Sequence, residues 1–334
     1  MKDEIALRFS DGTLEVRGLK EEEGHLLPAS CRWDPRILAF RSPALDYVDV
    51  VSCLTRHEIH FTDHAPAWSK LESGLQVHRA PRPFQTEALE SWRGGGGRGL
   101  VVLPTGAGKS QVALMAMDDI RRDTLVVAPT LDLVAQWRDL IRTSFGCSVG
   151  VIGGGEYRVE PITVTTYDSA HMHMEHLGAR FGLVVFDECH HLPGDAYALA
   201  AQCCLAPFRL GLSATPERAD GRHQQLMSLI GPSTYRCDVG ELAGDYLAQY
   251  SVEKILVELT PEERQRYEEA RQVYLDFIRS QGIRMGSPDG WSQFIIRSSV
   301  SVAGRRAMKA YKTQKQLAFA APSKLNYVEH LLHE

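Results

Sequence analysis

The segment Pro104–Ser110, which reads PTGAGKS, constrains the fold of this 334-residue chain more than any other feature. An apolar run, Gly99–Leu103, precedes it, and a helical pattern follows it. A strand, a glycine-rich turn and a helix in this order form the setting of a phosphate-binding loop. The amides of the turn and of the helix N-terminus would hold phosphate oxygens. The sequence therefore predicts an α/β domain that binds a nucleotide.

Individual roles follow from the residue types in this loop. Lys109 is expected to reach the β- and γ-phosphates, and the Ser110 hydroxyl is expected to ligate Mg²⁺. Leu103 stands where the generic pattern has its first glycine, so the working core is the shorter Gly-x-Gly-Lys-Ser. The loop residues predicted to contact the nucleotide are Thr105, Gly106, Ala107, Gly108, Lys109 and Ser110.

Acidic residues follow a second apolar run. The string Asp187-Glu188-Cys189-His190 comes directly after Leu183–Phe186. A carboxylate at the C-terminal end of a buried strand is placed to hold a nucleotide-bound Mg²⁺. We expect Asp187 to hold this metal ion, and Glu188 to orient and deprotonate the attacking water. His190 is expected to sense the γ-phosphate.

The tripeptide Ser213-Ala214-Thr215 follows a third apolar run, Phe208–Leu212. In this order the three motifs resemble motifs I, II and III of superfamily 2 helicases. The resemblance implies that Ser213, Ala214 and Thr215 couple hydrolysis to movement. Gln85, which follows Arg82-Pro83-Phe84, then looks like a Q motif. Because a Gln amide can pair with adenine, ATP is the expected nucleotide, with Arg82 and Gln85 among its binding residues.

Two stretches between these motifs resemble the backbone-contacting motifs of the same helicase lobe. One is Ala128–Leu131 followed by Gln136-Trp137, and the other is Thr165–Ala170, with Gly153–Gly155 between them. Hydroxyls, glycine amides and helix N-termini suit contacts to phosphates. Each stretch alone would be an ordinary turn or helix cap. The predicted DNA contacts here are Thr130, Gly154 and Thr166.

The C-terminal part of the chain carries the basic signal. Residues 279–324 contain nine lysines and arginines against one acidic residue. Arg305, Lys309 and Lys312 are spaced so that they share one face of a helix. Such a face can neutralise DNA phosphates. It can equally be a solvated helix surface, and the residues leave both interpretations open.

The alternation of apolar runs with helical patterns predicts the architecture of the central region. The candidate strands are Gly99–Leu103, Thr124–Ala128, Cys147–Val151, Ile162–Thr165, Leu183–Phe186 and Phe208–Leu212. Apolar strands separated by helices indicate a parallel sheet that is covered on both faces. The predicted fold class is therefore α/β, with a RecA-like P-loop NTPase lobe.

The regions on either side of this lobe differ from it. Around Asp11-Gly12 apolar and polar residues alternate, which predicts a β-hairpin because both turn positions need a positive φ. After about Ser251 we expect one more strand and then helices, with a helix start at Thr260-Pro261. The expected domains are a small α/β module (1–79), the lobe (80–250), a strand with helices (251–320), and the start of a further lobe (321–334).

Bulk composition narrows the class of protein. A formal charge of −5 and an apolar content of 44% are ordinary for a soluble globular chain. No apolar run is long enough to cross a bilayer. Seven cysteines without CxxC spacing indicate neither a disulfide framework nor a zinc ribbon. Reduced thiols and a cytoplasmic location are therefore expected, without a membrane partner.

Over most of its length the chain resembles the xeroderma pigmentosum group B (XPB) helicase family. The strings that carry this resemblance are Arg82–Gln85, Leu103–Ser110, Thr166–Ala170, Asp187–Pro193 (DECHHLP) and Pro207–Arg222 (PFRLGLSATPERADGR). The resemblance implies an ATP-driven 3′–5′ DNA helicase or double-strand translocase that acts in DNA repair or DNA opening. It also implies a damage-recognition-like domain at 1–79, a thumb-like helical region at 260–320, and a nuclease as a partner.

Two departures from the family pattern matter. The family has an Arg-Glu-Asp motif soon after motif III, whereas this chain has Arg218-Ala219-Asp220. The resemblance makes Arg218 and Asp220 DNA-binding candidates, and Ala219 puts strand opening in doubt. Motifs IV to VI do not follow, so we expect a truncated half whose turnover alone is weak or absent, because arginine fingers of such motors come from the second lobe.

Three alternatives remain open from the sequence. The chain could belong to a restriction-type or remodelling translocase of the same superfamily, which moves on duplex DNA without unwinding it. It could act alone as an ATP- and DNA-binding fragment without turnover. An RNA substrate is a third alternative, because motifs that contact the backbone look alike for both nucleic acids.

Overall fold

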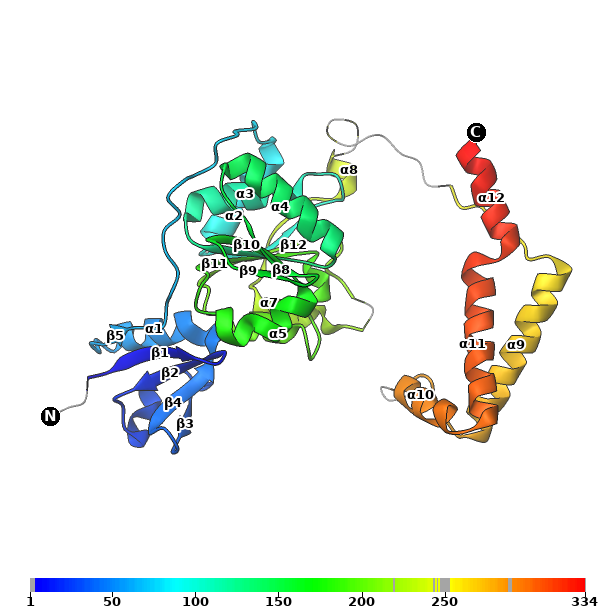
Figure 1. The fold of residues 1–334 in the computed structure, drawn as a ribbon, viewed down its shortest axis with the longest axis horizontal. Coiled ribbons are helices and arrows are strands. Elements are labelled where there is room, and N and C mark those ends of the chain that lie inside the picture. Colours follow the sequence, from blue (N-terminus) through cyan, green and yellow to red (C-terminus); the bar gives the residue numbers. More distant parts are fainter. Residues whose placement is uncertain are drawn as a thin grey trace. The chain divides into compact units, whose positions relative to one another are not determined.

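A computed structural model describes residues 4–218, 220–242, 244, 246, 253–287 and 290–333. It divides into two compact units, one up to Tyr250 and one from Ser251 onward (Figure 1). The first unit contains two β-sheets with their helices. In the described part of the second unit the regular elements are all helices.

The first sheet of unit 1 lies near the N-terminus and has the strand order β3-β4-β2-β1-β5. Its strands are β1 (Ala6–Ser10), β2 (Thr13–Arg17), β3 (Arg32–Asp34), β4 (Ala39–Pro43) and β5 (Thr62–Asp63). One face packs against α1 (Tyr47–Arg56), and two short 3-10 helices, η1 (Glu21–Leu26) and η2 (Ala44–Asp46), complete this module.

The predicted hairpin is confirmed. Strands β1 and β2 are antiparallel, and Ser10 pairs with Thr13 on either side of the turn. Asp11 has a φ of 46° and Gly12 a φ of 75°. Both turn residues therefore adopt the left-handed conformation, which matches the twist of the flanking strands.

The tip of this hairpin contacts the larger part of unit 1. A Cβ atom added to Gly12 would lie 2.7 Å from the Cys203 Sγ atom. Beside it, an Asp11 carboxylate oxygen lies 3.7 Å from His176 Nδ1. Gly12 is therefore needed for its positive φ and also for the close approach of the two parts.

The second sheet has eight strands in the order β13-β6-β12-β11-β7-β10-β8-β9. Its strands are β6 (Arg98–Val102), β7 (Thr124–Ala128), β8 (Gly150–Gly153), β9 (Glu156–Arg158), β10 (Ile162–Thr166), β11 (Leu183–Asp187), β12 (Phe208–Ser213) and β13 (Ser233–Arg236). Every neighbouring pair is parallel except β8 and β9. The predicted parallel α/β sheet is confirmed.

Helices cover both faces of this sheet (Figure 1). One face packs against α2 (Pro83–Gly94), α3 (Lys109–Ile120) and α4 (Leu131–Phe145). The other packs against α5 (Tyr167–Leu177), α6 (Ala198–Gln202) and α7 (Gln225–Leu229). Neighbouring residues of β7 illustrate the alternation: Val126 joins the first core and Val127 the second. Short 3-10 helices η3 (Cys189–His191) and η4 (Arg222–Gln224) and the helix α8 (Val239–Leu242) lie in the connections.

The predicted strands agree with the observed ones except in two places. Residues 147–149 are not part of a strand, because the pairing of β8 with β10 begins only at Gly150. The strand predicted after Ser251 is wrong for the described residues 253–260, which form no strand. A strand needs a hydrogen-bonding neighbour, and the described part of unit 2 offers no sheet edge. Leu256 there is 83% exposed.

The described part of unit 2 contains four helices. They are α9 (Pro261–Ser280), α10 (Gly290–Val300), α11 (Val302–Ala320) and α12 (Pro322–His333). The predicted start of α9 is confirmed, because the Thr260 hydroxyl accepts a hydrogen bond from the Glu263 amide. Phe277 and Phe294 form the centre of a small aromatic core. None of the helices in the described ranges is long and apolar enough to cross a membrane.

Candidate nucleotide-binding site

The phosphate-binding loop predicted from the sequence joins β6 to α3. Gly106 and Gly108 have φ values of 82° and 80°, and Gly108 caps the N-terminus of α3. A side chain would be strained at either position. Leu103 is fully buried, and its amide donates to the Ser213 carbonyl oxygen at 3.1 Å. It therefore extends the buried strand instead of taking part in the turn, which explains why this position tolerates a large apolar residue.

A cavity of about 330 Å³ lies over this loop. Its walls come from the loop and α3, from α4, and from the C-terminal end of β11. The lining residues are Gly106, Gly108, Lys109, Ser110, Leu133, Gln136, Trp137, Leu140, Asp187 and Glu188. The structure thus brings together Lys109, Ser110, Asp187 and Glu188, which the sequence predicted to share one site.

Two opposite charges in this cavity are in contact with each other. Lys109 Nζ lies 3.6 Å from Glu188 Oε1. Burial raises the pKa of Asp187, although a hydrogen bond from Trp137 and the charge of Lys109 act in the opposite direction. Glu188 has a φ of 46°, which is uncommon for a residue with a side chain. Backbone strain of this kind is concentrated at functional sites.

Two aromatic residues that sequence reasoning did not assign to this site hold Asp187 in place. Trp137 Nε1 donates to Asp187 Oδ2 at 2.8 Å. The Tyr167 hydroxyl donates to the Asp187 carbonyl oxygen at 2.9 Å. Both aromatic side chains are buried. Each lies in a stretch that the sequence assigned only to DNA contact, and nothing in the spacing indicated the acceptor.

A chain of polar contacts connects the end of β11 with the end of β12. His190 Nδ1 lies 3.1 Å from Ser213 Oγ and 3.3 Å from Glu188 Oε2. Ser213 Oγ also accepts a hydrogen bond from the Thr215 amide. Ser213 is fully buried, whereas Ala214 is half-buried and Thr215 is exposed. The predicted sensor and the predicted coupling motif are therefore in direct contact.

Gln85 contacts the phosphate-binding loop itself. Its Nε2 donates to the Ala107 carbonyl oxygen at 2.9 Å, and its Oε1 accepts from the Arg82 amide at 3.0 Å. Gln85 is 5% exposed. The Arg82 guanidinium lies over the ring of Tyr246, 5.5 Å from its centroid. Both polar atoms of the Gln85 side chain are thus in use, and its contact with adenine stays a prediction.

The predicted DNA contacts of this lobe lie along one edge of the sheet. Thr130 follows β7, Gly154 follows β8, and Thr166 ends β10, and these three strands are neighbours. Thr130 and Gly154 are exposed. Thr166 is 7% exposed, and its hydroxyl accepts the amide hydrogen bond that caps α5. The Thr166 hydroxyl is therefore used to cap α5, and it is not free.

The remaining candidates lie elsewhere. Arg218 forms a two-point ion pair with Asp220, and its Nη1 donates to the His190 carbonyl oxygen at 2.8 Å. Asp220 is held ionised, since its hydrogen bond with Arg218 keeps its pKa far below the usual range. Ala219 lies outside the described residues. In unit 2, Arg305, Lys309 and Lys312 are all exposed on α11.

Comparisons with known proteins agree with this geometry. The sequence pattern described as the xeroderma pigmentosum group B helicase damage recognition domain matches residues 7–65. The pattern of the res subunit of Type III restriction enzymes matches residues 78–218. The DNA 3′-5′ translocase XPB2 of Sulfurisphaera tokodaii is 37% identical over 306 residues, which cover 91% of this chain and 69% of the relative.

Other relatives match over shorter stretches. The DNA 3′-5′ helicase XPB of Kineococcus radiotolerans is 37% identical over 201 residues, which cover 56% of this chain and 36% of the relative. Among solved structures, the Hef helicase domain of Pyrococcus furiosus aligns with 71% of this chain and 58% of its own. Its sequence identity is 21% and its TM-score is 0.43. The chain thus spans about two thirds of XPB2 and about a third of the second relative.

Proposed function

The chain belongs to the XPB helicase family, and from this premise we propose that it supplies the ATP-binding lobe of a 3′–5′ DNA helicase or translocase. The observation that carries the proposal is the cavity lined by Lys109, Ser110, Asp187 and Glu188. An ammonium group, a hydroxyl and two carboxylates beside a glycine turn suit a nucleotide triphosphate with its Mg²⁺. The names of the relatives support the direction and the DNA substrate.

Each residue of the cavity has a distinct role in this proposal. Lys109 binds the β- and γ-phosphates, so its present contact with Glu188 is exchanged for phosphate oxygens. Ser110 and Asp187 are the protein ligands for Mg²⁺, which neutralises phosphate charge when it is bound. Glu188 is then free to accept the proton of the attacking water. The loop amides of residues 105–108 support the phosphates.

The contact between His190 and Ser213 supports a route from the nucleotide to the DNA-facing edge. His190 lies next to Glu188, and Ser213 leads directly into Thr215 and Arg218. Arg218 in turn donates a hydrogen bond to the His190 carbonyl oxygen. A change in the position of Glu188 would therefore act on His190, and through His190 on Ser213 and Arg218.

We assign DNA contacts to two regions. In the lobe these are Thr130, Gly154 and the Thr166 cap, together with the Arg218–Asp220 pair. On α11 they are Arg305, Lys309 and Lys312, which are exposed and share a face. The division into domains at residues 79, 250 and 320 remains a prediction. The nuclease partner is a proposal from the family resemblance, and the cytoplasmic location is a proposal from the cysteine pattern.

Binding of a fluorescent ATP analogue with Mg²⁺ tests the site directly. The Lys109→Ala variant loses the main cation for the phosphates, so we expect its affinity to fall at least about tenfold. The matched control is Lys70→Ala, which removes an exposed lysine of the same unit and should bind as the wild type does. Equal binding by Lys109→Ala and the wild type would contradict the site.

Turnover then tests the function. We expect ATP hydrolysis by proteins that contain this lobe to be stimulated by DNA and to vanish in Lys109→Ala. Stimulation by RNA equal to that by DNA would contradict the DNA assignment. Measurements on this 334-residue chain should be accompanied by the same measurements on a longer protein of the family.

A second candidate is translocation along duplex DNA without strand separation. Two observations favour it: the match to the res subunit of Type III restriction enzymes, and the name translocase of the XPB2 relative. A strand-displacement assay and a triplex-displacement assay on the same protein separate the candidates. Displacement of the third strand without separation of the duplex favours the translocase, whereas separation of the duplex favours the helicase.

A further inference from the structure

The N-terminal sheet presents a second basic surface, far from α11 in the sequence. Arg8, Glu15, Arg41 and Arg32 lie directly opposite one another on four neighbouring strands. Residues opposite each other in antiparallel strands point to the same face of the sheet. Arg17, two residues after Glu15, shares that face. We call the five side chains Arg8, Arg17, Arg32, Arg36 and Arg41 the arginine face.

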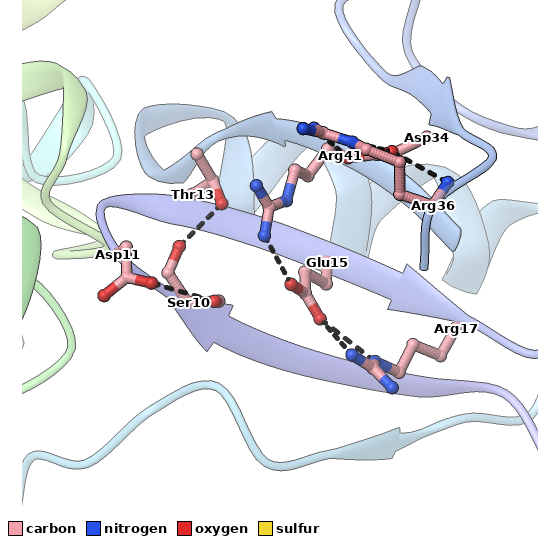
Figure 2. Close-up of polar contacts among 8 residues, drawn as sticks. All are labelled: Ser10, Asp11, Thr13, Glu15, Arg17, Asp34, Arg36 and Arg41. Carbon is pink, nitrogen blue, oxygen red and sulfur yellow. Dashed lines mark hydrogen bonds and ion pairs between the residues drawn. The ribbon is translucent and has the colours of Figure 1, made fainter. Parts of the chain in front are cut away.

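A buried acid arranges the middle of this face. Glu15 is 4% exposed and accepts hydrogen bonds of 2.8 Å from Nη2 of Arg17 and from Nη2 of Arg41 (Figure 2). Burial raises the pKa of Glu15, but the two guanidinium groups outweigh this effect and keep the pKa low. Glu15 is therefore ionised at neutral pH, and it holds both arginines across the sheet.

A second pair lies beside the first one. Arg36 donates two hydrogen bonds to Asp34, and this contact keeps the pKa of Asp34 at about 2 (Figure 2). The three paired arginines keep their Nη1 groups without a hydrogen-bond partner among the described residues. These Nη1 groups can donate to a ligand that supplies oxygens, whereas the Arg41 Nε atom is buried without a partner.

Arg8 and Arg32 stand at the ends of the row. Both are exposed, and within the described ranges neither forms a hydrogen bond or an ion pair. Five arginines against Glu15 and Asp34 leave the face with three net positive charges. The module as a whole is acidic, since residues 4–65 contain eleven acids and seven lysines and arginines. Charge is thus segregated toward this face.

The opposite side of the module is closed to such a ligand. The alternate residues Leu7, Leu14, Val16 and Phe40 form the core with α1. Several of the acids, Glu4, Glu21, Glu23 and Glu58, line a separate cavity. The sheet therefore has one face that is covered by the core with α1 and one face that carries the arginines.

We propose that the arginine face binds the phosphodiester backbone of DNA, without reading its sequence. Guanidinium groups bind phosphate oxygens through two parallel hydrogen bonds, and a row across strands about 4.8 Å apart offers several at once. Backbone contacts position a protein on nucleic acid and carry no base information. The choice of DNA over an acidic polypeptide rests on the proposed function.

The test measures the affinity of the full 334-residue chain for a short fluorescent duplex at several salt concentrations. The variant Arg8→Ala/Arg32→Ala removes the two arginines without partners, so the Glu15 network and the fold remain. The matched control is Lys20→Ala/Arg56→Ala, which removes two exposed cations of the same module away from this face. Circular dichroism and thermal melting verify that both variants are folded.

We expect the Arg8→Ala/Arg32→Ala variant to bind about tenfold more weakly at about 0.1 M salt. The slope of log K against log salt should become shallower by about two, roughly one for each lost phosphate contact. The control should match the wild type, and Arg8→Lys/Arg32→Lys should keep most of the affinity. Equal behaviour of the two alanine variants would overturn the proposal.

Two further outcomes separate this proposal from the proposed function. Labelled poly-glutamate that binds as tightly as DNA, with the same dependence on Arg8 and Arg32, would assign the face to an acidic polypeptide and overturn the proposal. Loss of DNA binding confined to variants of α11 or the lobe would also overturn it, while the proposed function stands. A wild type that binds ATP but no DNA would end both assignments of a DNA contact.

Discussion

At the residue scale, the nucleotide cavity depends on a side chain that the motif pattern did not assign to it. Trp137 reaches Asp187 across fifty positions of sequence, and its indole N–H is directed at the carboxylate that is proposed to hold Mg²⁺. A buried carboxylate favours its neutral form. The indole hydrogen bond opposes this effect without outweighing it, so Trp137 orients Asp187 and favours its ionised form.

Replacement of Trp137 by Phe removes this hydrogen bond and keeps an aromatic ring. We expect the Mg²⁺ concentration needed for half-maximal ATP binding to rise about tenfold, since a hydrogen bond to a charged group contributes roughly 1.5–3 kcal/mol. The matched control is Trp92→Phe, which also loses a buried indole hydrogen bond, to the Arg209 carbonyl oxygen. If both variants shift the Mg²⁺ dependence equally, the role of Trp137 is only structural.

Gly12 gives a second prediction at this scale. The Gly12→Ala variant places a Cβ atom against Cys203 and forces a φ of 75° on alanine. We expect a loss of unfolding free energy of about 2–3 kcal/mol, from strain and contact together. Gly96→Ala is the control, because Gly96 has the same φ and open space around it. Thermal unfolding of both variants measures the difference, and equal losses would exclude the contact as a cause.

At the element scale, the features that the sequence predicted well are those set by local chemistry. The β1–β2 hairpin and the start of α9 each depend on residues within a few positions, Asp11-Gly12 and Thr260–Glu263. The strands β9 and β13 were not predicted, because they are short and mostly polar and show no apolar pattern. Residues 253–260 contain the apolar run Ile255–Val257, which is typical of a strand, but pairing partners are a tertiary property that sequence cannot supply.

The acidic pairs of the N-terminal sheet give this element a pH dependence. The pKa of Glu15 and the pKa of Asp34 are both lower in the folded chain than in the unfolded one. The stability they contribute is fully present above the unfolded pKa of about 4–4.5. It is lost as the pH falls through the folded pKa values. Acidification should therefore loosen the first sheet below about pH 4.5.

The variant Glu15→Gln tests this dependence. At neutral pH we expect it to destabilise the module by about 1–2 kcal/mol, because two partly exposed arginines lose their acid. Its further loss between about pH 4.5 and 3 should be smaller than that of the wild type. Hydrogen exchange of the β1 and β2 amides measures both effects. The exposed pair partner Asp139 supplies the control, since Asp139→Asn should be nearly neutral.

At the scale of the whole molecule, the sequence motifs predicted which residues line the cavity. They did not predict the contacts between those residues. Lys109, Ser110, Asp187 and Glu188 were predicted because each follows a recognisable strand or turn. Their mutual pairing and the bonds from Trp137 and Tyr167 join distant segments, which no spacing rule relates. The division of the chain and the individual roles of the site residues stay predictions until variants are measured.

The net charge of the chain likewise does not show where its charged side chains lie on the surface. A net charge of −5 argues weakly against nucleic-acid binding, yet two clusters of arginines and lysines lie on α11 and on the arginine face. The total averages over surfaces that differ in sign. Because these two surfaces belong to separate units, the chain would have two independent binding sites for a polyanion.

The contact made by the turn of the β1–β2 hairpin has a mechanical consequence. Gly12 packs on Cys203 and Asp11 lies beside His176, so the turn of the first sheet contacts helix α5 and the end of helix α6. A displacement of α5 or of the end of α6 would therefore act directly on the turn between β1 and β2.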